Sequence, residues 1–103
     1  MLPKGPKEKR VDKRIPCDLE GVYISPDKFP HRIRCNNISL KGVGLVSSAP
    51  LPINNQATLI VSTKTVNPVL LEGKVCWCKE ALDKWSAGIN FNKELSFELK
   101  SLI

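Results

Sequence analysis

The sequence predicts an all-β domain, a small barrel or sandwich of about six strands, with one short helix at its C-terminal end. Three observations support this fold class. Apolar residues from position 18 onward fall in short alternating runs that Pro, Gly and Asn interrupt. Helical spacing occurs only at the last positions. A chain of 103 residues, 42% of them hydrophobic, forms one domain with a modest core, which disfavours a deep cleft between two lobes.

The first two strands are indicated by alternation and by a change of parity. Val22 and Ile24 alternate with Tyr23, and proline-containing pairs within residues 26–30 mark the turn that follows. In the second strand, apolar residues occupy odd positions up to the Asn36–Asn37 pair and even positions after it. Such a switch predicts a β-bulge or a tight turn, which redirects the side chains around it.

Four further runs complete the strand set, and Pro50 and Pro52 separate the first two of them. The alternation of apolar residues in these runs places Trp77 and Phe91 among the core residues. The alternating apolar positions are Val43 and Leu45; Ala57, Leu59 and Val61; Leu71, Val75 and Trp77; and Ile89 and Phe91. We therefore expect the barrel to occupy about residues 17–92.

A C-terminal helix is expected over about residues 93–103, where it would cover one mouth of the barrel. Asn92 is placed as its N-cap. The residues with the i, i+4, i+7, i+8 spacing of one helical face are Leu95, Leu99, Leu102 and Ile103.

Positive charge is concentrated at the N-terminus. The chain carries 16 Lys and Arg against 10 Asp and Glu, a net charge of +6, and residues 1–14 hold +4 of this excess. The balance indicates an anionic partner such as nucleic acid, a phosphorylated ligand or a membrane surface. Residues 1–8, with prolines and a glycine among the lysines, are expected to be a flexible basic tail.

Several classes of protein are disfavoured by what the sequence lacks. No apolar run is long enough to span a bilayer, and no apolar segment follows the N-terminal charges, so we expect a cytoplasmic protein. His31 is the single histidine and is expected at the surface, in a turn. Because neither a nucleophile elbow nor a phosphate-binding glycine loop occurs, we expect neither an enzyme nor a cofactor.

The four cysteines are expected to be reduced thiols rather than metal ligands. Zinc sites need paired knuckles with ligands two to four residues apart. Cys76 and Cys78 share a strand, where they would point the same way, and Cys17 and Cys35 are isolated in sequence. Small buried side chains are the favoured interpretation, and no metal is expected.

Two short motifs carry the functional signal. Arg10 and Arg14 stand four residues apart just before the first strand, and residues 37–42 have the form Asn-x-Ser-x-x-Gly at the end of the second. An arginine fork binds phosphate bidentately and also bonds the O6 and N7 acceptors of guanine. In an extended chain the two arginines would be up to roughly 13 Å apart, wide enough to embrace a dinucleotide.

The second motif adds polar groups and a glycine. On a strand, Asn37 and Ser39 face the same way while Ile38 points inward, so an amide and a hydroxyl could bond the edge of a guanine. Gly42 permits a positive φ or a close approach of ligand and backbone. A local network that stabilises a turn is the alternative for Asn37 and Ser39. For Gly42 and Gly44, a purely conformational role is the alternative to ligand contact.

In combination these motifs resemble the PilZ domain, the bacterial receptor module for cyclic di-GMP. The hallmark motifs RxxxR and (D/N)xSxxG are both intact, as Arg10–Arg14 and Asn37–Gly42. The later segments that follow the family's order are residues 43–45, 73–77 and 88–91. The resemblance implies a PilZ-like domain over residues 9–103, a six-stranded antiparallel split barrel with a C-terminal helix.

The resemblance also implies roles for the site residues. Arg10 and Arg14 would bind guanine and phosphate. Asn37 and Ser39 would bind a base edge, while Gly42 would shape the turn. The candidate residues that bind cyclic di-GMP are thus Arg10, Arg14, Asn37, Ser39 and Gly42, with Lys9, Lys13 and Gly44 as further candidates.

Lys9 departs from the family, whose members often carry an arginine or an apolar residue before the first arginine of RxxxR. In the family that position is linked to binding of one ligand or of an intercalated pair. A lysine neutralises a second phosphate but does not stack on a base as a guanidinium does. The number of ligands therefore stays open, with the pair favoured.

We expect a stand-alone receptor for cyclic di-GMP, a monomer or a ligand-modulated dimer. Its N-terminal arm would fold over the barrel when the arginines close on the ligand, and would present a new surface to an effector protein. A basic barrel that binds single-stranded nucleic acid is one alternative, disfavoured because few aromatic side chains are available for stacking. A PilZ-like adaptor that no longer binds nucleotide is another, disfavoured because both motifs are complete.

Overall fold

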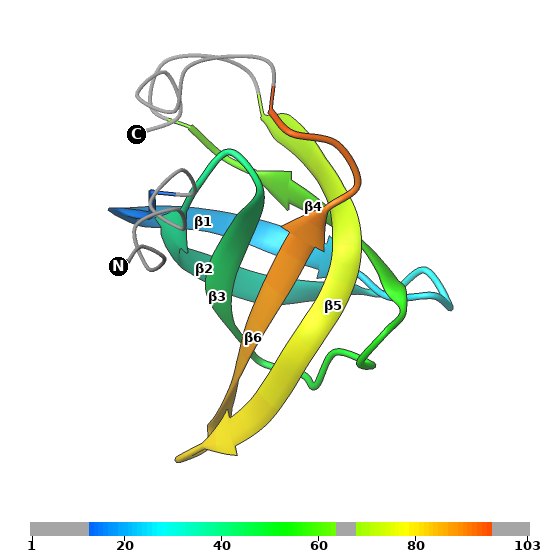
Figure 1. Cartoon of the computed structure of the whole chain (residues 1–103). Coiled ribbons are helices and arrows are strands. Elements are labelled where there is room, and N and C mark those ends of the chain that lie inside the picture. The colour runs from blue at the N-terminus through cyan, green and yellow to red at the C-terminus, as the bar shows by residue number, and fades with distance from the viewer. Residues whose placement is uncertain (1–12, 64–67, 96–103) are drawn as a thin grey trace, which may run out of the picture.

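Six antiparallel strands form the fold, in a computed structural model that describes residues 13–63 and 68–95 (Figure 1). The strands are β1 (Ile15–Ile24), β2 (Pro30–Ile38), β3 (Gly42–Ser47), β4 (Gln56–Val61), β5 (Val69–Ala81) and β6 (Lys84–Phe91). The predicted all-β class and the six strands are confirmed, and the strands span residues 15–91 where the sequence indicated about 17–92.

The barrel is closed, with the strand order β1-β2-β3-β6-β5-β4. Closure comes from β1 and β4, which pair over Gly21–Ile24 and Thr58–Val61. Gly21 permits this pairing, because a Cβ at its position would lie 2.5 Å from the carbonyl oxygen of Ile60. The expected split in the barrel is therefore absent from the part of the chain that the structure describes.

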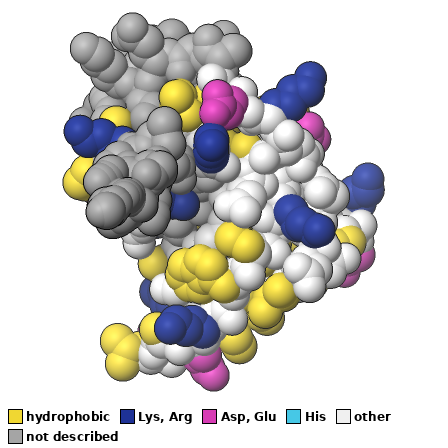
Figure 2. Space-filling model, in the orientation of Figure 1, with side chains coloured by type: hydrophobic (Ala, Val, Ile, Leu, Met, Phe, Trp, Pro, Cys, Tyr) yellow, Lys and Arg dark blue, Asp and Glu magenta, His cyan; other side chains and the backbone are white. Residues whose placement is uncertain are grey.

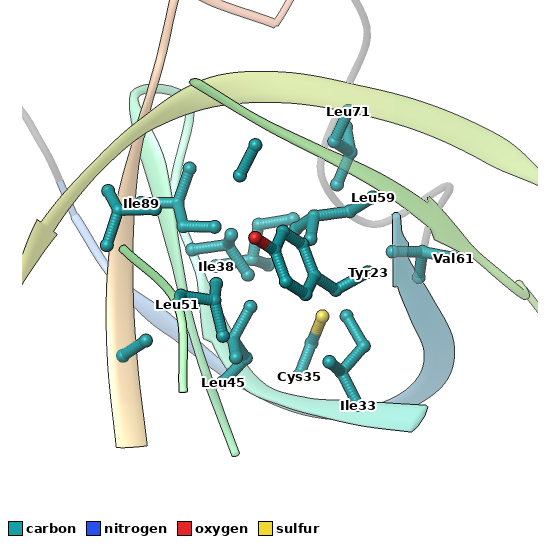
Figure 3. Close-up of a cluster of buried hydrophobic side chains, with 14 of the residues drawn as sticks. Tyr23, Ile33, Cys35, Ile38, Leu45, Leu51, Leu59, Val61, Leu71 and Ile89 are labelled. Atoms are coloured by element: carbon teal, nitrogen blue, oxygen red, sulfur yellow. The ribbon is translucent and has the colours of Figure 1, made fainter. Parts of the chain in front are cut away.

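A single core fills the barrel (Figure 3). Tyr23 lies at its centre, with Cys35 and Leu59 beside it. The alternation in β1 runs opposite to the one expected, since Tyr23 is 1% exposed while Val22 and Ile24 are half-buried. All three side chains are apolar or aromatic, so hydrophobicity alone did not decide which face of β1 is inside.

Two bulges interrupt the alternation of side chains in β2 and β5. The register shifts between Cys35 and Asn37, which confirms the predicted change of parity in β2. A second shift lies between Val75 and Trp77. Trp77 is consequently 44% exposed, and its predicted place in the core is wrong. The bulge turns outward a side chain that uninterrupted alternation would bury.

The second bulge also separates Cys76 from Cys78. Cys76 is exposed, whereas Cys78 is half-buried and its Sγ accepts a hydrogen bond from the backbone N–H of Leu51. The two thiols therefore do not point the same way, contrary to expectation. Of the four free cysteines only Cys35 is fully buried.

Several expected features lie outside the described residues. These are the basic tail, residues 1–8, the candidate ligand residues Lys9 and Arg10, and residues 96–103 of the expected helix. Leu95, the last described residue, donates its backbone N–H to the carbonyl oxygen of Leu40 and packs against the core. No helix capable of crossing a membrane occurs in residues 13–63 and 68–95.

Two titratable groups are buried in the core in their neutral forms. Burial raises the pKa of the Cys35 thiol from 9.0 to about 12. Burial also raises the pKa of Tyr23, whose hydroxyl has no hydrogen-bond partner among the described residues. Because both pKa values are higher in the folded chain, folding favours the protonated forms.

We predict that the free energy of unfolding falls as pH rises above about 9, the pKa that Cys35 has when it is not buried. The Cys35 contribution is fully present below that pH and is lost towards about pH 12, at up to about 1.4 kcal/mol per pH unit. Urea unfolding between pH 7 and 11 measures it. Cys35→Val removes the thiol and should flatten the fall; an identical pH slope in this variant would contradict the prediction.

Candidate functional site

One cross-strand row on the outer wall of the barrel forms the base of the site. Pro16 of β1 pairs with Asn37 of β2, which pairs with Gly44 of β3. Gly44 pairs with Gly88 of β6, which pairs with Trp77 of β5. Five strands therefore bring residues from distant parts of the sequence side by side.

A pocket of about 590 Å³ opens along this row, and Arg14 and Asn36 complete its lining. It unites Arg14 of the first motif with Asn37 of the second and with Gly44, three of the predicted ligand-binding residues. Figure 2 shows hydrophobic side chains gathered over β5 and β6, with basic side chains around them. Lys13 is exposed but does not line the pocket.

Arg14 and Asn37 are in direct contact, which joins the two sequence motifs. Arg14 Nη1 donates a hydrogen bond of 2.7 Å to Asn37 Oδ1. Asn37 Nδ2 in turn donates to Asn36 Oδ1 over 2.9 Å, which fixes the orientation of the Asn37 amide. A guanidinium carries five N–H donors, so Arg14 keeps donors for a ligand while it is held in place. Among the described residues, Arg14 is the charged side chain in the pocket lining.

Two facing glycines let planar side chains lie close against the sheet. A Cβ at Gly44 would lie 2.6 Å from Asn37 Nδ2, and a Cβ at Gly88 would overlap Trp77 Nε1. The Asn37 amide therefore lies over Gly44, and the Trp77 indole lies over Gly88. Neither glycine has a positive φ, so both serve close approach rather than an unusual backbone conformation.

Ser39 and Gly42 build the turn from β2 to β3 instead of facing the pocket. Ser39 is fully buried, and its hydroxyl accepts hydrogen bonds from the N–H groups of Lys41 at 3.2 Å and Gly42 at 3.1 Å. The expectation that Ser39 shares an exposed face with Asn37 is wrong, because β2 ends at Ile38 and strand alternation ends with it. The turn-stabilising alternative describes Ser39 in this structure.

Gly42 is needed where β3 approaches β6. A Cβ at its position would lie 2.6 Å from the carbonyl oxygen of Ile89 and 3.4 Å from Arg14 Nη2. No described glycine has a positive φ, so the positive φ considered for Gly42 is not found, and the close approach seen here is that of the β6 backbone. The Arg14 guanidinium therefore lies close to the start of β3.

Trp77 is the site residue that sequence reasoning missed. Its position agrees with the core phase of Leu71 and Val75, and only the bulge at Cys76 turns it outward. One signal was available, because Gly44 and Gly88 leave a strip of sheet without side chains that a nearby planar group can cover.

Two further observations concern a second hollow and possible metal ligands. A larger hollow of about 640 Å³ lies next to the pocket on the barrel wall, and it contains none of the predicted ligand residues that the structure describes. In residues 13–63 and 68–95, no cluster of three or more His, Cys, Asp or Glu side chains could hold a metal ion.

The family comparison matches residues 7–103 to the PilZ domain. The chain belongs to the PilZ domain family. PilZ domains are bacterial modules that bind cyclic di-GMP and effector proteins and do not themselves catalyse reactions. The match includes both motifs and all six strands, so the resemblance read from the motifs is confirmed.

One solved structure similar to this PilZ domain is the inhibitor of motility from Bacillus subtilis, MotI/DgrA. The two share 14% identity with a TM-score of 0.66, over 86% of this chain and 45% of that one. The chain thus spans less than half of that protein, and at this identity the similarity establishes the fold alone. A search of curated proteins finds no match.

We predict that Gly88→Ala displaces the Trp77 indole, because the new Cβ would occupy the space of Nε1. The expected loss of stability is roughly 1–3 kcal/mol. Tryptophan emission measured in a Trp85→Phe background, where Trp77 alone reports, should shift in wavelength. Ser86→Ala, the outward neighbour on β6, is the matched control, and equal spectra for the two variants would contradict the proposed contact.

Proposed function

We propose that this PilZ domain is a receptor for cyclic di-GMP and that the ligand binds in the pocket over Gly44 and Gly88. The observation that carries the proposal is the direct contact of Arg14 with Asn37 beside an exposed Trp77. A cation, an oriented amide and an aromatic face are thereby presented together. A cyclic dinucleotide has a complementary group for each, namely its phosphates, its base edges and its base planes.

Arg14 supplies the charge in this scheme. Its guanidinium matches a phosphate or the O6 and N7 atoms of guanine, and its existing bond to Asn37 reduces the ordering cost on binding. Asn37 offers amide donors and an acceptor to a base edge. Ser39 and Gly42 would act indirectly. They stabilise the turn that follows Asn37 and leads into β3.

Trp77 would provide a stacking surface in the pocket that Arg14 also lines. Its indole covers Gly88 with one face and leaves 44% of the residue exposed. Stacking of a base on an aromatic side chain contributes about 1–3 kcal/mol in single-stranded nucleic-acid complexes. A guanine stacked on Trp77 would bury the exposed part of the indole.

The N-terminal arm supplies the remaining charge in the proposal. Arg10 would close over the ligand from the opposite side to Arg14, and Lys9 and Lys13 would neutralise phosphate charge. Ordering of this arm on the ligand would change the surface offered to an effector protein. The receptor would act as a monomer or a ligand-modulated dimer, with one ligand or an intercalated pair bound.

Single-stranded nucleic acid is the second candidate ligand, and the exposure of Trp77 is the observation that favours it. A site for a general single strand needs several stacking positions along a basic groove. The pocket offers one aromatic and one cation among the residues described. Cyclic di-GMP therefore fits the pocket better.

We predict that the protein binds cyclic di-GMP in isothermal titration calorimetry and that Arg14→Ala weakens binding about 10- to 100-fold. The magnitude follows from loss of a hydrogen bond to a charged group, about 1.5–3 kcal/mol. Trp77→Ala should cost about 10-fold through lost stacking. Arg32→Ala, at an exposed arginine outside this pocket, is the control and should leave the affinity unchanged.

Failure of the wild-type protein to bind cyclic di-GMP would refute the function. Equal affinities for Arg14→Ala and Arg32→Ala would refute the assigned site. Binding of a single-stranded oligonucleotide with a steep salt dependence, in place of cyclic di-GMP, would support the second candidate.

A further inference from the structure

The second and larger hollow, about 640 Å³, forms a groove on the outer wall of β4, β1, β2 and β3, and Lys84 at the start of β6 also lines it. Two neighbouring cross-strand rows build it. In one row Ile60 pairs with Val22, which pairs with Arg32. In the other, Glu20 pairs with Arg34, which pairs with Val46. We call this hollow the wall groove.

Apolar side chains form the floor of the wall groove, at positions of the outer wall where polar residues are expected. Val22 and Val46 are half-buried, and Ile60 is 38% exposed. Leu70, the β5 partner of Ile60, extends the apolar strip and is 58% exposed. A contiguous exposed apolar patch with a polar rim is typical of a protein-binding surface.

The rim of the wall groove carries excess positive charge. Arg34 is already paired, with Asp18 Oδ1 at 2.5 Å and Glu20 Oε2 at 2.7 Å. Arg32 and Lys84 also line the groove, and within the described residues neither has a carboxylate partner. The rim therefore offers two unpaired cations to an occupant with carboxylates.

The wall groove adjoins the pocket proposed for cyclic di-GMP. Asn36 lines both hollows. Its side chain accepts the hydrogen bond from Asn37, whose own oxygen accepts the bond from Arg14. A ligand that engages Arg14 therefore acts on a side chain in the groove wall through two hydrogen bonds.

We propose that the wall groove binds an acidic segment of an effector protein, one that inserts apolar side chains between Arg32 and Lys84. This proposal rests on the proposed function in one respect, that cyclic di-GMP strengthens the binding. The apolar floor and the carboxylates at its edge disfavour nucleic acid. A second copy of this chain is disfavoured by its net charge of +6, which opposes docking on a basic rim.

Two matched pairs of variants test the wall groove. Ile60→Glu places a charge on its floor, and Ile53→Glu makes the same change at an isoleucine that is 48% exposed and lies outside it. Arg32→Glu reverses a rim charge, and Lys74→Glu does so on the outer face of β5. Thermal unfolding checks that each variant is folded.

The experiment starts from the full chain, immobilised with and without cyclic di-GMP and exposed to extract of the bacterium that encodes it. The protein retained is purified and titrated against the wild type and the four variants. Ile60→Glu and Arg32→Glu should weaken its binding at least 10-fold, and the two controls less than about 2-fold. All four should bind cyclic di-GMP as the wild type does.

Linkage supplies a second readout. If cyclic di-GMP strengthens effector binding by some factor, the effector must strengthen cyclic di-GMP binding by the same factor. The proposal is overturned if both members of a pair lose affinity equally, if no protein is retained, or if the retained species is nucleic acid or a second copy of the chain. Failure of the proposed function is detected separately: the wild-type protein, without any effector, would then not bind cyclic di-GMP.

Discussion

Side chains in a closed barrel alternate between core and solvent, and the site depends on two bulges that break this alternation. Without them Asn37 would follow Cys35 into the core, and Trp77 would follow Val75. One extra residue in each strand turns both side chains to the outer wall. The facing glycines of β3 and β6 then provide the space in which both planar groups lie close to the backbone. The bulges and the glycines are therefore parts of one arrangement.

The sequence predicted the strands and the parity change in β2 because turn residues and alternation are local signals. It also brought Arg14, Asn37 and Gly44 together, through the family resemblance. It failed at Trp77, since the bulge between Val75 and Trp77 has no polar residue to mark it. It also failed at Ser39, whose place in the turn depends on where β2 ends. Tyr23 shows a similar limit, because Val22, Tyr23 and Ile24 are all apolar or aromatic and these three residues alone do not reveal which face is buried.

Contact between the motifs would allow a small barrel without a deep cleft to hold the proposed recognition site. Arg14 is held by Asn37, which is held by Asn36, so the cation is partly preorganised before a ligand arrives. The same chain of bonds leads into the wall groove. Ligand recognition and effector recognition would thus share one side chain, which gives a short physical route from binding to output.

The most direct test of this account is a map of backbone and side-chain N–H chemical shifts during titration with cyclic di-GMP. The account predicts the largest changes along one cross-strand row, at the Asn37 side-chain amide, Gly44, Gly88 and the Trp77 indole N–H, with smaller changes at Asn36. Largest changes at Arg32, Arg34 and Lys84, with the row unaffected, would place the ligand in the wall groove and contradict the account.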